Sequence, residues 1–271
     1  MSAYFAVCTM YKNHARYLCE WLEFHRLVGA ERFFLYDNGS EDEHRQVLEP
    51  YVDEGLVVVH DWPQSPGMAG AFNDCLREHR TDARWIAFID IDEFLFSPLG
   101  VPLPGILQDY EYAPGVGVNQ WIFGTSGHET SPPGLVIENY TRRASTPNSF
   151  IKSVVDPARA VESGNPHFFW YQDGAVGVSE NHEPLPANFG RSPNASWSRL
   201  RINHYMTKSK EEWQAKLDGV EPYGGRPRQS YAPNVVKRTF DDEVDDTIQM
   251  YLPALRDAVA ARAMPQPAER G

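Results

Sequence analysis

The first third of the chain alternates short apolar runs with segments of helical spacing. Runs with the length and composition of buried strands cover residues 4–10, 32–36, 56–59 and 85–89. The segments between them predict helices at residues 13–29, 42–51 and 71–79. This alternation is typical of a doubly wound, parallel α/β sheet, whose right-handed crossovers bring the loops after the strands to one edge.

Capping signals place the ends of the first helix. Asn13 is the predicted N-cap, and Gly29 is predicted to stop the helix.

The rest of the chain is less regular. Residues 98–114 hold four prolines and two glycines and are predicted as loop. Strand-like segments recur at 117–123 and 201–205, and short strands of a mixed sheet edge are expected between them. Residues 135–143 fit either helix or strand.

The C-terminal part predicts two helices. Ser209 and Glu212 form a capping box for a helix over 210–217. A second helix is expected over 241–262, kinked or split at Pro253, followed by a disordered tail at 265–271.

The strand at 85–89 runs directly into three acidic residues, Asp90, Asp92 and Glu93. Open α/β sheets bind ligands at the carboxyl ends of their strands. In regular strand Asp90 and Asp92 share a face, and Glu93 points elsewhere unless the chain bends. Paired carboxylates favour Mg²⁺ or Mn²⁺ between them, and the alternative is a solvated acidic turn.

Other polar residues fall at the ends of neighbouring strands. Thr9 and Lys12 follow the first strand, and Asp37 follows the second. With the acidic stretch they suit a nucleotide, with one acid near the base or ribose and a metal bridging a diphosphate. Asp37 also forms an ordinary turn in Asp-Asn-Gly-Ser, and Lys12 is equally a plain surface charge.

Composition restricts the choice of ligand and compartment. The chain of 271 residues is 42% hydrophobic and 13% aromatic and carries a net charge of −12, which argues against nucleic acid as a partner and against general binding to anionic membranes. The three cysteines form no metal-ligand spacing and read as free thiols. With no secretory signal and no apolar run of spanning length, a cytoplasmic protein is expected, with peripheral membrane association still open.

An ordered set of motifs resembles glycosyltransferase family 92 and its bacterial relatives, close to family 2. The motifs are KN at 12–13, EWLEFH at 20–25, FLYDNGS at 34–40, FIDIDEF at 88–94, FGTSGH at 123–128 after Trp121, KSVV at 152–155 and NHYMTKS at 203–209. The resemblance covers residues 4–218. His14 departs from it, since an acid is expected after Lys12-Asn13.

The resemblance implies a GT-A fold in one domain over residues 1–264. It would comprise a nucleotide-binding half at 1–96, an acceptor half at 97–240 and the helix at 241–264. It also implies a nucleotide-sugar donor, usually a uridine diphosphate sugar, and a Mn²⁺ or Mg²⁺ cofactor. The activity would be an inverting transfer to a saccharide or glycolipid acceptor.

Roles carry over residue by residue from the resemblance. Asp37 would contact uracil or ribose. Asp92 would bind the metal, and Asp90 would reach the metal through water or touch ribose. His204 would be a third contact to metal or diphosphate, and Lys208 would lie near the phosphates. A structural histidine at this strand end is the competing interpretation of His204.

The remaining candidates complete the predicted site. Thr9, Lys12, Asn73 and Ile91 are assigned to the donor, and Trp121 and His128 to the acceptor, although Trp121 also suits packing and Asn73 a solvated helix surface. The acceptor hydroxyl needs a general base, for which the candidates are Glu129, Asp173, Glu180 and Glu183.

Two other functions compete with a transferase. A nucleotidyltransferase would need a glycine-rich basic loop after the first strand, which residues 9–14 do not provide. A non-catalytic nucleotide- or carbohydrate-binding module on the same fold remains the alternative.

Overall fold

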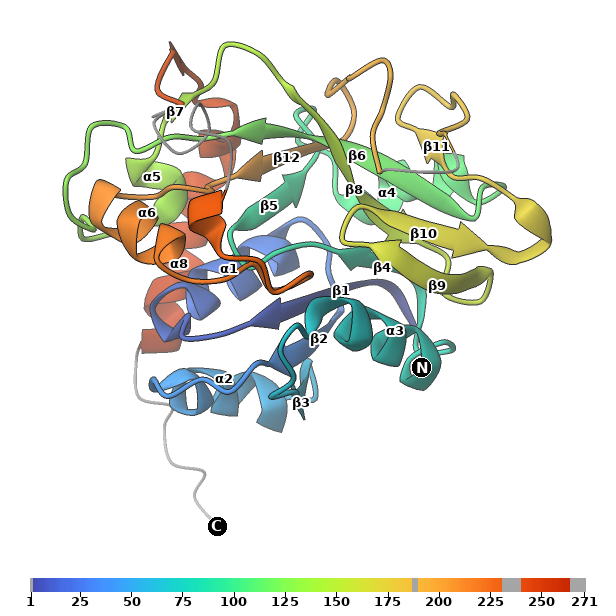
Figure 1. The fold of residues 1–271 in the computed structure, drawn as a ribbon, viewed down its shortest axis with the longest axis horizontal. Coiled ribbons are helices and arrows are strands. Elements are labelled where there is room, and N and C mark those ends of the chain that lie inside the picture. Colours follow the sequence, from blue (N-terminus) through green and yellow to red (C-terminus); the bar gives the residue numbers. More distant parts are fainter. Residues whose placement is uncertain (1, 187–189, 231–239, 264–271) are drawn as a thin grey trace.

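The computed structural model describes residues 2–186, 190–230 and 240–263, which fold around one large mixed sheet (Figure 1). Its strands follow the order β3-β2-β1-β4-β8-β6-β12-β5, and β11 pairs with β6. These strands are β1 (Ala3–Tyr11), β2 (Arg32–Asp37), β3 (Val57–Asp61), β4 (Ala83–Phe88), β5 (Glu93–Phe96), β6 (Gly115–Ile122), β8 (Asn148–Val155), β11 (Val178–Ser179) and β12 (Arg201–His204). Two small ladders pair β9 (Ala160–Asn165) with β10 (Phe168–Tyr171) and β7 (Arg142–Arg143) with β13 (Glu243–Val244).

Helices connect the strands and cover the sheet. They are α1 (Ala15–Leu27), α2 (His44–Asp53), α3 (Met68–Glu78), α4 (Leu103–Leu107), α5 (Val136–Asn139), α6 (Lys210–Leu217) and α8 (Leu252–Ala263). Short 3₁₀ turns are η1 (Gln108–Tyr110), η2 (Gln172–Gly174), η3 (Arg228–Ser230) and η4 (Thr247–Tyr251). Among the described residues, every helix is too short or too polar to cross a membrane.

The N-terminal half confirms the α/β prediction. Strands β1 to β4 are mutually parallel where they pair, with β1 between β2 and β4, and α1, α2 and α3 lie in the connections as the sequence predicts. The mixed strands that follow form the extension expected of a GT-A fold.

The start of α1 differs from the prediction. His14, not Asn13, occupies the N-cap position, and Asn13 adopts a positive φ of 55°. Its side-chain oxygen instead accepts the Glu41 N–H at 2.8 Å, which ties the loop after β1 to the loop after β2. Gly29 does stop the helix, with a φ of 108° that favours glycine.

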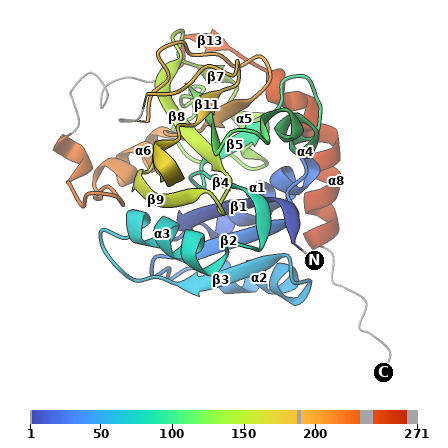
Figure 2. The same cartoon turned by 90° about the vertical axis from the view of Figure 1, so that its right-hand side faces the viewer.

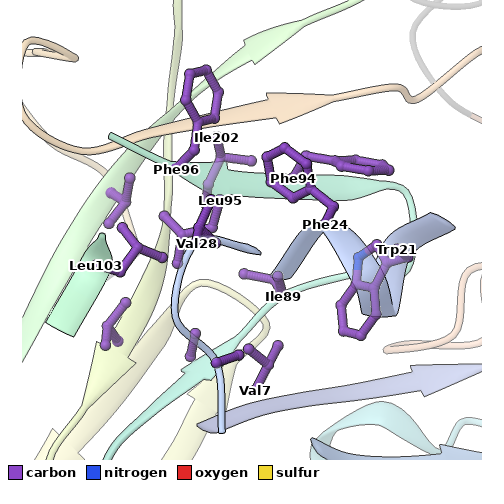
Figure 3. Close-up of a cluster of buried hydrophobic side chains, with 14 of the residues drawn as sticks. Val7, Trp21, Phe24, Val28, Ile89, Phe94, Leu95, Phe96, Leu103 and Ile202 are labelled. Carbon is purple, nitrogen blue, oxygen red and sulfur yellow. The ribbon is translucent and has the colours of Figure 1, made fainter. Parts of the chain in front are cut away.

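Two apolar layers enclose the sheet. Alternate residues of β1 face opposite layers: Val7 packs with α1, and Cys8 packs with α3. Figure 2 shows α3 on the left of the strands and α8 on the right. In the α1 layer, the Phe24 ring meets the Phe94 ring at 5.0 Å, so α1 packs directly on β5 (Figure 3).

Two strands of the extension run in the same direction as β1 to β4. Strand β8 is antiparallel to both β4 and β6, so β6 runs in the same direction as β4. Strand β12 is parallel to β6. The carboxyl ends of β1, β2, β4, β6 and β12 therefore lie at one edge of the sheet, called the carboxyl edge below.

Two predictions in the second half are wrong in part. Residues 98–114 are not all loop, since they contain α4 and η1. The C-terminal helix begins at Leu252, after β13 and η4, and not at residue 241. The helical segment is split next to Pro253, since the 3₁₀ turn η4 ends at Tyr251 and α8 begins at Leu252. Pro253 thus lies in the first turn of α8, where a helix needs no proline N–H. The predicted tail at 265–271 lies outside the described residues.

Two further predictions concern residues 135–143 and the helix over 210–217. Residues 135–143 form the short helix α5 and then β7, so both expectations hold in part. Helix α6 has the predicted capping box between Ser209 and Glu212.

A buried ion pair anchors the strand that carries His204. Asp245 lies 2.8 Å from the Arg201 guanidinium on β12 and 2.7 Å from that of Arg143. Burial would raise the pKa of Asp245, but Arg201 and Arg143 lower it to about 2. Because this pKa is depressed, the stability it contributes is present above about pH 4 and is lost as the pH falls toward 2.

We expect Asp245→Asn to lower the free energy of unfolding by about 2 kcal/mol at pH 7. The difference from the wild type should shrink below pH 4, as measured by urea denaturation at pH 7, 5 and 3. Asp246→Asn is the control, since Asp246 is exposed and has no ion pair among the described residues. An equal loss at pH 3 and pH 7 would contradict the prediction.

Candidate functional site

The acidic stretch forms a tight turn between β4 and β5. The Asp90 N–H donates to Glu93 Oε2 at 2.8 Å, and the Glu93 N–H donates to the Asp90 carbonyl at 3.0 Å. The chain therefore bends, and Glu93 points into the protein with no exposed surface. On the α1 side, the Trp21 indole N–H donates to the Glu93 carbonyl at 2.8 Å.

Strand β12 brings His204 to this turn. In the sheet, His204 on β12 is the register partner of Glu93 on β5 and of Ile122 on β6. Its Nε2 lies 3.4 Å from Asp92 Oδ1, and its Nδ1 lies 3.1 Å from Gln120 Oε1. One ligand atom each of Asp90, Asp92 and His204 lies within 4.8 Å of the others. The structure thus brings together the three predicted metal ligands.

Two lysines that the sequence did not assign neutralise the acids. Lys152 on β8 is 1% exposed and lies 2.8 Å from Asp90 Oδ2 and 3.4 Å from Glu93 Oε2. Lys216 on α6 lies 2.5 Å from Asp92 Oδ2. Each aspartate thus gives one oxygen to a lysine. The other oxygen of Asp92 faces His204, and the other oxygen of Asp90 has no hydrogen-bond partner among the described residues.

Burial and these cations set the protonation of the acids. Burial opposes ionisation, yet Lys216 and His204 hold the pKa of Asp92 well below its usual range. Burial likewise opposes ionisation of Asp90, and Lys152 lowers its pKa. Burial raises the pKa of Glu93 to about 7, so this carboxyl is the weakest acid of the three.

The residues fit a divalent cation. Asp90 Oδ1 is buried and has no hydrogen-bond partner among the described residues. A buried carboxylate oxygen without a partner is unfavourable unless a ligand satisfies it. Two carboxylate oxygens and an imidazole nitrogen suit Mn²⁺, and the oxygens also suit Mg²⁺.

A further cation lies beside the cluster without a carboxylate of its own. Lys208 is 7% exposed, and its ammonium lies 4.7 Å from the centre of the Tyr17 ring. No carboxylate of the described residues forms an ion pair with it. Burial lowers its pKa, and its backbone has a φ of 49° that is strained for a lysine. These features favour a role for Lys208 in binding an anionic ligand.

His14, the departure from the family pattern, belongs to the same region. Its Nδ1 lies 2.6 Å from the Lys12 carbonyl. Burial and the charges of Lys208 and Lys216 lower its pKa to about 4, against an opposing effect of Asp92. His14 is therefore neutral at pH 7.

The structure places the predicted donor-binding residues in different surroundings, some at the carboxyl edge and some buried in the protein. Asp37 lies at the carboxyl edge, where one oxygen accepts the Ser40 N–H at 2.9 Å and the other lies 3.4 Å from His44 Nε2. Lys12 is exposed in the loop after β1. Thr9 is fully buried within β1, and Ile91 is 6% exposed in the acidic turn.

Asn73 has a structural partner instead. It lies on α3, and its side-chain oxygen accepts the Ser163 N–H at 2.7 Å, which ties α3 to β9.

The base candidates lie at opposite edges of the sheet. Glu129 lies beside the first turn of α6, at the carboxyl edge, and pairs with Lys210 at 2.6 Å. Glu183 lies next to β11, which pairs with the first residues of β6 at the far edge. Asp173 is also remote from the carboxyl edge. It follows β10, and the N–H of the preceding Gln172 donates to the carbonyl of Arg159, which lies shortly after the end of β8.

Glu180 has a structural role. It is 3% exposed and accepts the backbone N–H groups of Ser198, Arg199 and Leu200. Burial acts to raise its pKa, but these hydrogen bonds lower it. The carboxylate thereby fixes the loop before β12 and has no oxygen to spare for a proton transfer.

The two residues predicted to bind the acceptor also make contacts within the protein. Trp121 is 4% exposed, with the Trp197 ring 4.8 Å away and the Arg143 guanidinium 3.7 Å above its ring. This packing leaves no open ring face for a sugar. His128 is half-buried, and its Nε2 lies 3.2 Å from the Asn139 carbonyl.

Comparison with known proteins assigns the family. The family model described as "Glycosyltransferase family 92" matches residues 3–222. A family 92 protein of Oryza sativa subsp. japonica is 31% identical over 79% of this chain and 35% of its own length. A family 92 protein of Ricinus communis is 32% identical over 78% of this chain and 37% of its own length. The chain thus spans about a third of the length of these relatives.

Weaker similarities cover a smaller part of the chain or have a lower identity. A galactan beta-1,4-galactosyltransferase of Arabidopsis thaliana is 32% identical over 34% of this chain and 20% of its own length. Among solved structures, S. aureus TarS is 11% identical with a TM-score of 0.40, covering 79% of this chain and 38% of TarS. The match over residues 3–222, which includes the acidic turn, His204 and Lys208, shows that the chain belongs to glycosyltransferase family 92.

Proposed function

We propose that this protein transfers a sugar from a uridine diphosphate sugar to a hydroxyl group of a saccharide or glycolipid acceptor, with inversion and with Mn²⁺ or Mg²⁺ as cofactor. One observation carries the proposal. Asp90, Asp92 and His204 converge at the carboxyl edge, and a buried oxygen of Asp90 has no partner among the described residues.

Asp90, Asp92 and His204 would hold the cation. When bound, a divalent cation supplies a Lewis acid that neutralises the charge developing on the diphosphate leaving group. Lys152 would keep Asp90 ionised and fixed in place.

The chain's own cations would complete the diphosphate site. Lys208 is a buried ammonium that forms no ion pair with a carboxylate of the described residues, and a phosphate oxygen would give it a charge-assisted hydrogen bond. At the other end of the nucleotide, Asp37 lies at the end of β2, where it would contact the uracil or the ribose.

Transfer would be a single displacement. The acceptor oxygen forms a bond to the anomeric carbon while the bond from that carbon to the phosphate oxygen breaks, and the electron pair leaves with the diphosphate. The hydroxyl proton goes to a general base. Glu129 is the base candidate that lies at the carboxyl edge, where its carboxylate pairs with Lys210.

The relatives support a saccharide acceptor. Three relatives that match about a third of the chain are named galactan beta-1,4-galactosyltransferases. The name specifies a polysaccharide, galactan.

The donor site can be tested by thermal unfolding with Mn²⁺ and uridine diphosphate. At a nucleotide concentration 100-fold above the dissociation constant, we expect a stabilisation of about 2.7 kcal/mol, seen as a higher melting temperature. Asp92→Asn should abolish the shift because it removes a charged ligand, whereas Asp257→Asn on α8 should retain it. A shift that needs no metal, or that survives in Asp92→Asn, would argue against the metal site. No shift with any nucleoside diphosphate would sink the transferase proposal.

The base can be tested by turnover. We expect Glu129→Gln to lower kcat by about 10²-fold or more, the usual contribution of a general base, while uridine diphosphate binds as before. Released uridine diphosphate is measured with a panel of oligosaccharide acceptors. Glu211→Gln on the same surface is the control. Unchanged turnover in Glu129→Gln would remove Glu129 from the mechanism, and donor binding without turnover in the wild type would favour a binding module.

A further inference from the structure

We propose that Lys216 is an exchangeable counter-ion, held by Asp92 in the free protein and transferred to the donor diphosphate on binding. Metal and diphosphate would then bind cooperatively because the diphosphate releases Asp92 from its ammonium partner. This inference rests on the proposed donor site and adds a coupling between its two ligands.

The contacts of Lys216 show what it does before a ligand arrives. Its ammonium lies 2.5 Å from Asp92 Oδ2 and 3.1 Å from the Met206 carbonyl. It therefore occupies one of the two oxygens of a residue that would bind the cation. An ammonium and a divalent cation on the same carboxylate repel each other, so Lys216 weakens metal binding as long as it stays there.

Lys216 is more accessible to solvent than Lys152, which pairs with the other aspartate. The side chain of Lys152 is 1% exposed and is shared between Asp90 and Glu93 in the middle of the sheet. The side chain of Lys216 is 25% exposed and extends from the last turn of a helix. Only flexible side-chain torsions have to change for its ammonium to leave Asp92.

Helix α6 itself is fixed at both ends, so the exchange needs no movement of the backbone. The capping box of Ser209 and Glu212 holds its first turn. The segment after it docks on the donor half, where the N–H groups of Gly67 and Met68 donate to the Pro222 carbonyl at 3.0 and 3.2 Å. Lys216 therefore stays within reach of the carboxyl edge.

A diphosphate gives the ammonium a better partner. A diphosphate bound to a cation on Asp92 brings phosphate oxygens next to the same carboxylate, and these carry more negative charge than Asp92 alone. Lys216 can then form a charge-assisted hydrogen bond to phosphate, and Asp92 recovers its second oxygen. Because coupling of two binding equilibria is reciprocal, the metal must also tighten diphosphate binding by the same factor.

The coupling can be measured by titrating Mn²⁺ and following the electron paramagnetic resonance signal of free Mn²⁺, with and without uridine diphosphate. The proteins are the wild type, Lys216→Met, Lys216→Arg and Lys210→Met. Lys210→Met is the matched control because it removes one lysine charge from the same helix, at a site that pairs with Glu129.

We expect Lys216→Met to bind Mn²⁺ alone about tenfold more tightly than the wild type, within the usual range of such couplings. The factor by which uridine diphosphate tightens Mn²⁺ binding should fall about tenfold in the same variant. Lys216→Arg should keep most of the coupling, and Lys210→Met should match the wild type. Melting temperatures establish that each variant is folded.

Two outcomes would overturn this inference and leave the proposed function standing. The first is cooperative binding in the wild type with the same two constants in Lys216→Met. The second is weaker binding of Mn²⁺ alone by Lys216→Met, which would mean that Lys216 positions Asp92 for the metal. A wild type that binds neither Mn²⁺ nor uridine diphosphate would overturn the proposed function together with it.

Discussion

Three carboxylates in one buried turn require compensating charge, and much of the second half of the chain is arranged to supply it. Unpaired buried carboxylates would be strongly unfavourable. Lys152 arrives on β8, His204 on β12 and Lys216 on α6, each from a different and distant part of the sequence. Asp90 nevertheless keeps one buried oxygen without a partner among the described residues. The compensation is thus incomplete on the side where a cation would bind.

The order of the strands makes this convergence possible. Strand β8 lies between β4 and β6 and runs against both, which places Lys152 beside the acidic turn. Strand β12 lies between β6 and β5, so His204 arrives opposite Glu93. The N-terminal half therefore supplies the acids, and the extension supplies the groups that balance them. A donor bound at this edge would contact both halves of the molecule.

Some of this arrangement follows from sequence, because local pattern determines it. Strand length and helical spacing predict β1 to β4 and α1 to α3, and the acids at the end of β4 mark the carboxyl edge. His204 becomes a candidate only through the ordered motifs of the family, since a lone histidine after a short strand carries little signal. Lys152 could have been noticed as the one charge within the strand-like run at 150–155.

Other residues could not be placed, because their positions depend on pairing between distant segments. Lys216 lies on a helix whose polar pattern gives it no distinction from Lys210. The base candidates were equivalent in sequence, and only the pairing of β11 with the start of β6 separates Glu183 from Glu129. His14 looked like a departure from the family pattern, yet the charges of Lys208, Asp92 and Lys216 act on its pKa, so it lies near the site.

The most direct test of the account is a crystal structure with Mn²⁺ and uridine diphosphate, with anomalous diffraction recorded at the manganese edge. The account predicts an anomalous peak bonded to Asp92 and His204 and lying next to Asp90, with the diphosphate on its open side and Lys208 within hydrogen-bond distance of a phosphate oxygen. A bound nucleotide with no manganese peak at this cluster, and with both aspartates still paired only to their lysines, would contradict it.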